Sequence, residues 1–198
     1  MDSGNIGFVL LCAAFVFVMT PGLAMFYGGL VRKKNVVNTM MTSIFIIGVG
    51  IVMWVLFGYS LSFAPSGNAF IGDFRWLGLE GVSLTEGYTD DASIPNMVFS
   101  AFQMMFAVIT PALITGAVAG RMKFKSIFVF TIFWSLIVYY PLAHMVWGQG
   151  GLLGADGIGA LDFAGGDVVH ISSGVSALVL CILLGKRHDY EHSIRSEE

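Results

Sequence analysis

Long uncharged apolar runs, separated by short polar connections, make up most of this chain. A helix of roughly 20 residues crosses a hydrocarbon core of about 30 Å, and five of the runs reach that length. Stretches of about ten residues with strict apolar and polar alternation, typical of transmembrane β-strands, do not occur. The pattern therefore predicts an all-α polytopic membrane protein with helices at about residues 6–31, 38–64, 94–120, 126–147 and 166–185.

The connections and the ends of the chain indicate the domain organisation. An outer loop at about residues 65–93 is rich in Gly, Ser and acidic residues, which is typical of a surface loop. The start, MDSGN, carries an acid where a signal peptide carries basic residues, so the first run is predicted to remain as a membrane helix. We expect one membrane domain over residues 1–185 and a polar cytoplasmic tail over 186–198.

Basic and acidic residues fall in different connections. Those after the first, third and fifth helices carry Arg32, Lys33, Lys34, Arg121, Lys123, Lys125, Lys186 and Arg187. The other two connections hold Asp73, Glu80, Glu86, Asp90, Asp91 and Asp156 against Arg75 alone. Because Lys and Arg near helix ends stay on the cytoplasmic side, we expect a multi-pass cell-membrane protein with its N-terminus outside and its C-terminus in the cytoplasm. The net charge of −3 averages two opposite faces and gives no indication of nucleic-acid binding.

Composition agrees with the membrane assignment. Hydrophobic residues make up 56% of the chain and charged residues 12%, against about 25% charged residues in soluble domains. Cys12 and Cys181 lie at different depths and are expected to be free thiols, and no metal-site spacing is present, so we expect neither a metal nor a cofactor. Small residues in GAVAG at 116–120 and in the fifth helix predict close helix packing.

Few ionisable residues lie within the apolar runs. Such a group costs on the order of 3 kcal/mol at the bilayer centre, so it is usually functional or paired. His170 lies one to two turns inside the fifth helix, where a neutral imidazole would either accept a proton or hydrogen-bond a neighbouring helix. Asp162 precedes this helix and is expected to cap its N–H groups, while its charge would also attract cations to the outer mouth.

Aromatic side chains occur near the same level. Phe102 and Phe106 are four residues apart and share a helix face, and Trp147 falls at the outer end of the fourth helix. Packing and an interfacial aromatic belt are the ordinary roles of such residues. With an acid nearby they would also form a cation-π site for a small cation, contributing about 0.5–2 kcal/mol.

Two other chemistries have weaker support. His144 and His170 would be the ligands of a bis-histidine haem, but no repeated histidine pair occurs on two helices. An intramembrane hydrolase would use Asp162, His170, Ser172 and Ser173, but no GxSxG elbow or oxyanion site is marked. We therefore do not expect an enzyme.

Four stretches together carry a family resemblance. They are PGLAMFYGGLVRKKNVVN from Pro21, FQMMFAVITPALITGAVAGR from Phe102, YYPLAHMVWGQGGLL from Tyr139 and DFAGGDVVHISSGVSALVLCILLGKR from Asp162. In this respect the chain resembles the ammonium transporter family (Amt/Mep), relatives of the Rh proteins. The resemblance implies that Phe102, Phe106 and Trp147 form an outer ammonium-recruitment site shaped by Asp162. It also implies that Phe106 belongs to a gate and that His170 is the first of a histidine pair lining a hydrophobic pore.

The same resemblance implies an architecture and partners. The five helices would form the first of two inverted repeats, in a protein that transports ammonium or ammonia, with methylammonium as an analogue. Family members form homotrimers, and a PII-type nitrogen regulatory protein is an expected partner. Three hypotheses remain open: an N-terminal portion of a transporter, a half-transporter that needs a complementary chain, and a membrane ammonium sensor that does not conduct.

Overall fold

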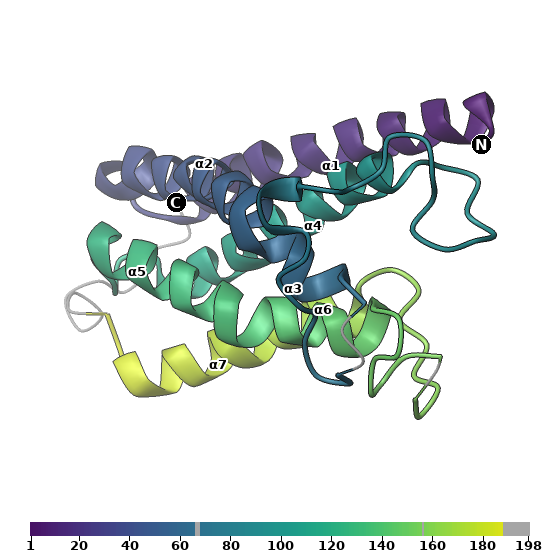
Figure 1. Cartoon of the computed structure of the whole chain (residues 1–198). Helices are drawn as coiled ribbons and strands as arrows, with labels where there is room; N and C mark the ends of the chain where they lie inside the picture. The colour runs from purple at the N-terminus through teal and green to yellow at the C-terminus, as the bar shows by residue number, and fades with distance from the viewer. Residues whose placement is uncertain (66–67, 156, 188–198) are drawn as a thin grey trace.

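The protein is a bundle of helices (Figure 1). The computed structural model describes residues 1–65, 68–155 and 157–187, which include no strand. The predicted all-α fold is therefore confirmed, while Asp156 and most of the predicted polar tail lie outside the described residues. The α-helices are α1 Ser3–Leu30, α2 Val36–Met53, α3 Tyr59–Phe63, α4 Asn96–Val118, α5 Phe124–Trp134, α6 Tyr140–Trp147 and α7 Ser172–Leu184.

Three of the membrane-spanning helices contain a π-helical turn. These turns are η2 Trp54–Gly58 between α2 and α3, η4 Ser135–Tyr139 between α5 and α6, and η5 Gly166–Ile171 before α7. Short 3₁₀ turns, η1 Lys33–Asn35 and η3 Leu77–Leu79, lie in the connections. Within the part of the chain that the structure describes, five continuous helices are long and apolar enough to cross a membrane, as the sequence predicts: Ser3–Leu30, Lys33–Phe63, Asn96–Val118, Phe124–Trp147 and Gly166–Leu184.

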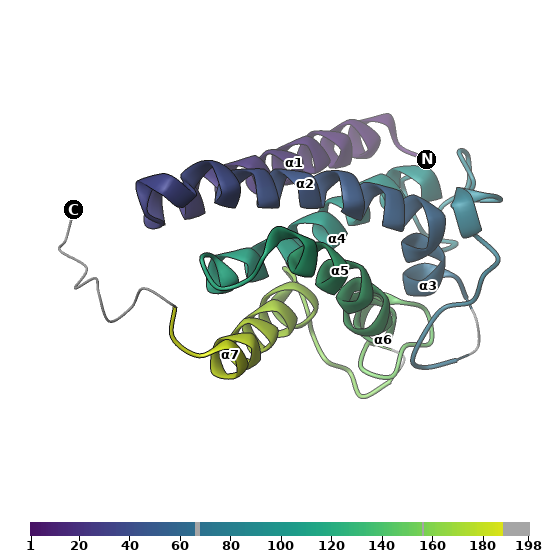
Figure 2. The same ribbon diagram turned by 90° about the vertical axis from the view of Figure 1, so that its left-hand side faces the viewer.

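Helix α4 is the centre of the bundle. It packs against α1, α2 and α7, and its apolar stretch is the most buried of the five spans. Figure 2 shows α1 and α2 on one side of α4 and α5, α6 and α7 on the other. Helix α4 therefore contacts both halves of the bundle, which also meet directly where α2 packs on α5 and α3 on α6.

Glycines allow two of these helix pairs to approach closely. A Cβ added to Gly116 of α4 would lie 2.5 Å from Cζ of Tyr27 on α1, and one added to Gly50 of α2 would lie 3.0 Å from Val108 of α4. The close packing predicted for GAVAG is thus confirmed at Gly116. In the fifth span α7 packs against α4 and buries Ser172 and Ser173, but Gly174 takes no part, because a Cβ there would have no neighbour within 4 Å.

The two ends of the bundle carry opposite charge. The N-terminus and the segments 64–65, 68–95, 148–155 and 157–165 lie at one end (Figure 1). There the Asp2 backbone N–H donates to the Ser93 carbonyl at 2.8 Å, and the Leu152 backbone N–H donates to the Ala69 carbonyl at 2.9 Å. This acidic end holds Asp73, Glu80, Glu86, Asp90 and Asp91. The turns that bear the basic residues lie at the opposite end, called the basic end below.

Candidate functional site

Three aromatic rings meet near the acidic end of the bundle. The rings of Phe102 and Phe106, one turn apart on α4, are 5.0 Å apart between centroids at an interplanar angle of 80°. The ring of Trp147, the last residue of α6, is 6.4 Å from that of Phe106 at 66°. Both pairs are edge-to-face, the favoured geometry for aromatic rings. We call these three residues the ring cluster. Its members on α4 and α6 are far apart in sequence, with 41 positions from Phe106 to Trp147.

A hollow of about 380 Å³ lies beside Trp147. Its lining residues are Tyr88, Thr89, Ala92, Ile94, Phe99, Gln103 and Trp147. Tyr88 stacks on Phe99 at 4.9 Å, and its hydroxyl accepts the Gln149 N–H at 3.0 Å. The outer loop is therefore fixed to both α4 and the end of α6, and it forms one wall of the hollow.

Gln103 is a site residue that the sequence reasoning missed. It lies on α4 between the two phenylalanines, is 9% exposed, and its Oε1 has no hydrogen-bond partner among the described residues. A buried amide oxygen without a partner is costly, so such a group is often found at a binding site. The signal was present in the sequence as the one polar side chain within the apolar stretch FQMMF.

Asp162 caps the fifth span, as predicted. Its carboxylate accepts the backbone N–H groups of Gly166, Asp167 and Val168 at 2.7, 2.9 and 2.9 Å. Gly165, with φ of +79°, makes the turn that directs these N–H groups back toward the carboxylate. The carboxylate also lies at the positive end of the helix dipole, which stabilises its charge.

His170 lies in the π-helical turn η5, and its backbone N–H donates to the Gly165 carbonyl at 2.9 Å. Its side chain is exposed on the surface of this chain. Helices α4 and α6 both pack against η5, so the elements that carry the ring cluster and the histidine are in contact. The structure thus brings Phe102, Phe106 and Trp147 together, with His170 on the adjoining segment.

His144 has a structural environment. It is 0% exposed, with Nδ1 3.1 Å from the Ser62 carbonyl oxygen and Nε2 2.8 Å from the Asn68 carbonyl oxygen. Both ring nitrogens face acceptors, which favours a hydrogen-bonding role over haem ligation.

The serines after His170 are also engaged. Ser172 and Ser173 donate to the carbonyls of Val168 and Val169, as serines inside membrane helices do. This arrangement disfavours a nucleophilic role for either hydroxyl.

Comparisons with known proteins all match one family. A model of the Ammonium Transporter Family matches residues 7–198. An ammonium transporter of Bacillus subtilis (strain 168) is 53% identical over 189 residues, covering 96% of this chain and 46% of that protein. An ammonium transporter of Aquifex aeolicus is 44% identical over 191 residues, covering 96% of this chain and 44% of that protein.

Solved structures agree with the sequence comparison. Candida albicans Mep2 superimposes with a TM-score of 0.84 at 34% identity, over 96% of this chain and 41% of Mep2. The chain spans less than half the length of the relatives it matches. With its helical bundle, its ring cluster and a family match over nearly its whole length, the chain belongs to the ammonium transporter family.

Proposed function

We propose that this chain forms the outer recruitment site and one wall of the pore of an ammonium transporter in the cell membrane, with its N-terminus outside. The observation that carries the proposal is the ring cluster of Phe102, Phe106 and Trp147, on two helices that both contact the segment bearing His170. The acidic end, which would face the outside, attracts cations to this site. The function proposed is transport and involves no enzymatic reaction.

The ring cluster suits a small cation that must lose water. Ring faces attract a cation by about 0.5–2 kcal/mol each when desolvated, and the neighbouring hollow beside Trp147 gives access from the outer loop. Moving the charged ion further into apolar surroundings is costly, so loss of a proton there favours passage as ammonia. The role of Asp162 is then indirect, because its carboxylate orients the start of η5 through three N–H bonds.

His170 would act as the first polar contact after the ring cluster. A neutral imidazole both donates and accepts a hydrogen bond, so it can replace water around ammonia. Its exposure in this chain fits a pore whose opposite wall comes from a further segment, either of a longer protein or of a complementary chain. A homotrimer and a PII-type regulatory partner, implied by the family, belong to the same proposal.

Uptake of methylammonium into cells that lack their own ammonium transporters tests the proposal. The chain would be compared with His170→Ala and with Ile171→Ala, a matched control at the neighbouring exposed position, which is 57% exposed. Where the chain conducts, alone or together with the segment that supplies the opposite wall, we expect uptake to be lost in His170→Ala and kept in Ile171→Ala. Absence of uptake by a membrane-inserted chain would show that it does not conduct alone.

Binding of methylammonium to the purified chain tests the recruitment site separately. Trp147→Leu should weaken binding by about 2–30-fold, the equivalent of 0.5–2 kcal/mol of cation-π attraction. Trp134→Leu, which removes an indole buried elsewhere in the bundle, is the control. Equal loss in both variants would contradict the recruitment site.

A further inference from the structure

The hollow beside Trp147 contains a buried hydrogen-bond acceptor. Gln103 of α4 lines the hollow and is 9% exposed, and its Oε1 has no hydrogen-bond partner among the described residues. Leaving a buried amide oxygen without a donor is costly, so a donor is expected to reach it. Since the described helices and loops supply none, the donor has to come from a molecule that occupies the hollow.

The remaining lining of this hollow is largely aromatic and apolar. Tyr88 stacks on Phe99 with 4.9 Å between ring centroids, and Trp147 forms another part of the wall. Aromatic ring faces attract cations, and the described lining residues include no Lys or Arg. The volume of about 380 Å³ is more than ten times the roughly 30 Å³ that a water molecule takes in the liquid. A small organic cation therefore fits.

Two acidic residues lie in the loop that lines the hollow. Thr89 and Ala92 are both lining residues, and Asp90 and Asp91 occupy the exposed positions between them. The Ala92 backbone N–H donates to the Thr89 carbonyl at 3.0 Å, so these four residues form a tight turn. Their negative charge raises the local concentration of cations at the edge of the hollow.

Hydrogen bonds hold this loop against the helices. The Asn96 backbone N–H donates to the Glu86 carbonyl at 2.8 Å, and Gln149 Nε2 donates to the Tyr88 carbonyl at 3.1 Å. Both ends of the loop segment are thus fixed, one to α4 and the other beyond α6. A hollow that is already formed costs a ligand less ordering of the protein on binding.

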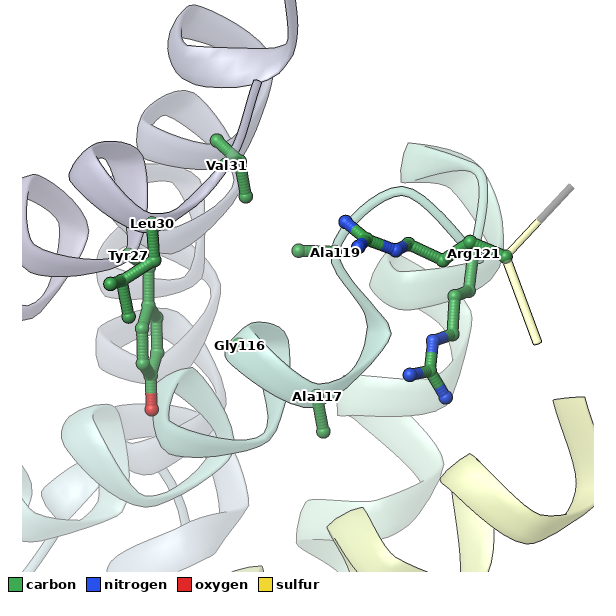
Figure 3. A pocket seen from close by; sticks show the side chains of 8 residues that line it. Tyr27, Leu30, Val31, Gly116, Ala117, Ala119 and Arg121 are labelled. Atoms are coloured by element: carbon green, nitrogen blue, oxygen red, sulfur yellow. The ribbon is translucent and has the colours of Figure 1, made fainter. Parts of the chain in front are cut away.

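A second hollow, at the basic end, lacks these features. Figure 3 shows it between Tyr27 and Leu30 of α1 and the turn that bears Arg121, and Arg187 also lines it. The Tyr27 hydroxyl donates to the Leu113 carbonyl at 2.9 Å and is therefore already engaged. Guanidinium groups repel a cation, so of these two hollows the one beside Trp147 is suited to a positively charged ligand.

We propose that the hollow beside Trp147 binds ammonium or a primary alkylammonium ion, and that Gln103 Oε1 accepts one of the N–H groups of the ion. Hydrogen bonds from a charged donor are roughly twice as strong as those between neutral groups. Gln103 thereby distinguishes ions that carry N–H groups from quaternary ions of the same charge. The inference rests on the proposed function, because Trp147 belongs to both this hollow and the ring cluster.

Binding of methylammonium and of tetramethylammonium to the purified chain, measured by calorimetry, tests the proposal. The two ions have the same charge, but tetramethylammonium has no N–H. In Gln103→Met, which keeps the length of the side chain without its acceptor, methylammonium affinity should fall by roughly tenfold or more. Tetramethylammonium affinity should fall by less than about twofold, because the ring faces remain. Gln103→Glu keeps an acceptor oxygen and should retain the preference for methylammonium.

An equal fall for both ions in Gln103→Met would overturn the role of Gln103, because it would show a change in the hollow as a whole. Unchanged methylammonium affinity, with an unchanged unfolding midpoint, would overturn it too, since Oε1 would then not contact the ion. Trp147→Leu separates this inference from the recruitment site, because a ring face acts on charge and its loss should weaken both ions.

The two substitutions therefore fail independently. Weaker binding in Trp147→Leu but not in Gln103→Met would overturn this inference and leave the recruitment site standing. Weaker methylammonium binding in Gln103→Met but not in Trp147→Leu would support the role of Gln103 and remove the ring cluster from recruitment. Absence of methylammonium binding to the unaltered chain would overturn both.

Discussion

Two histidines in the membrane-spanning part occupy opposite environments. His144 is fully buried on α6, with backbone carbonyls of Ser62 and Asn68 at 3.1 and 2.8 Å from its two ring nitrogens. His170, on η5, is exposed on the surface of the chain. A neutral imidazole carries one N–H, so His144 donates to one of its two carbonyls at a time. The buried histidine holds this chain together, whereas the exposed one is available to another molecule.

Glycines show the same contrast between the packed bundle and the α7 surface. Gly116 on α4 has no room for a side chain, while Gly174 on α7 faces open space. Apolar residues of α7, among them Leu178 and Ile182, are 61% and 70% exposed. The α7 surface is therefore suited to lipid or to a further protein segment, and substitutions there should leave the fold of this chain intact.

The largest effect is expected at His144. His144→Ala removes the one N–H donor that two backbone carbonyls share and leaves a cavity, and should lower the free energy of unfolding by about 3 kcal/mol. His170→Ala, the matched control, should change it by less than about 0.5 kcal/mol. Unfolding of the two variants in detergent, followed by tryptophan fluorescence, measures the difference. Similar destabilisation by both would show that the contrast between the two histidines is wrong.

A second pair of variants compares the glycines. Gly116→Ala forces a methyl group against the Tyr27 ring and should destabilise the chain by about 1–2 kcal/mol. Gly174→Ala adds the same methyl group where nothing lies within 4 Å, and should stabilise the helix by up to about 1 kcal/mol. Unfolding midpoints of the two variants provide the check, and a shift in the same direction would contradict the assignment.

The cap at the start of η5 should have a moderate effect. Asp162→Ala removes the acceptor of three backbone N–H groups and should lower the free energy of unfolding by about 1 kcal/mol. Asp162→Asn keeps an acceptor but loses the charge, so its cost should be smaller. Hydrogen exchange of the amides at residues 166–168 reports on the cap directly. Unchanged exchange in the Ala variant would mean that another group protects these amides.

The smallest effect is expected for the hydrogen bond between α5 and α7. The Trp134 indole N–H donates to Ser176 Oγ at 2.8 Å. Ser176→Ala should cost about 0.5–1 kcal/mol because the indole N–H loses its acceptor. A double-mutant cycle with Trp134→Phe isolates the pair from the bond that Ser176 makes to Ser172, and a coupling energy near zero would refute its contribution.

Properties that depend on long stretches of sequence could be predicted. The five spans follow from the length of the apolar runs, and the cap at Asp162 from an acid placed just before a helix. The spacing of Phe102 and Phe106 predicted that they share a helix face, and in the structure their rings are in contact.

Properties that depend on tertiary contacts could not be predicted. The carbonyls that bind His144 come from residues 62 and 68, more than seventy positions away, and no local pattern marks them. For Gln103 the sequence shows a polar side chain within an apolar stretch, but the hollow that it lines is formed by loop residues distant in sequence. The π-helical turns leave no signature in an apolar run, since hydrophobic periodicity inside a membrane bundle is weak.

Those π-helical turns determine how related sequences should be aligned. Each turn contains one residue more than a regular helix of the same rise would need, which rotates the following side chains by about 100°. In the span Phe124–Trp147 the turn at Ser135–Tyr139 thereby sets the direction of Trp147 relative to α4. A homologue with a one-residue gap at this turn would keep an equally apolar span, yet its tryptophan would point away from the phenylalanine. Single-residue gaps at these positions therefore distinguish homologues that keep the geometry of the ring cluster from those that keep only its residue types.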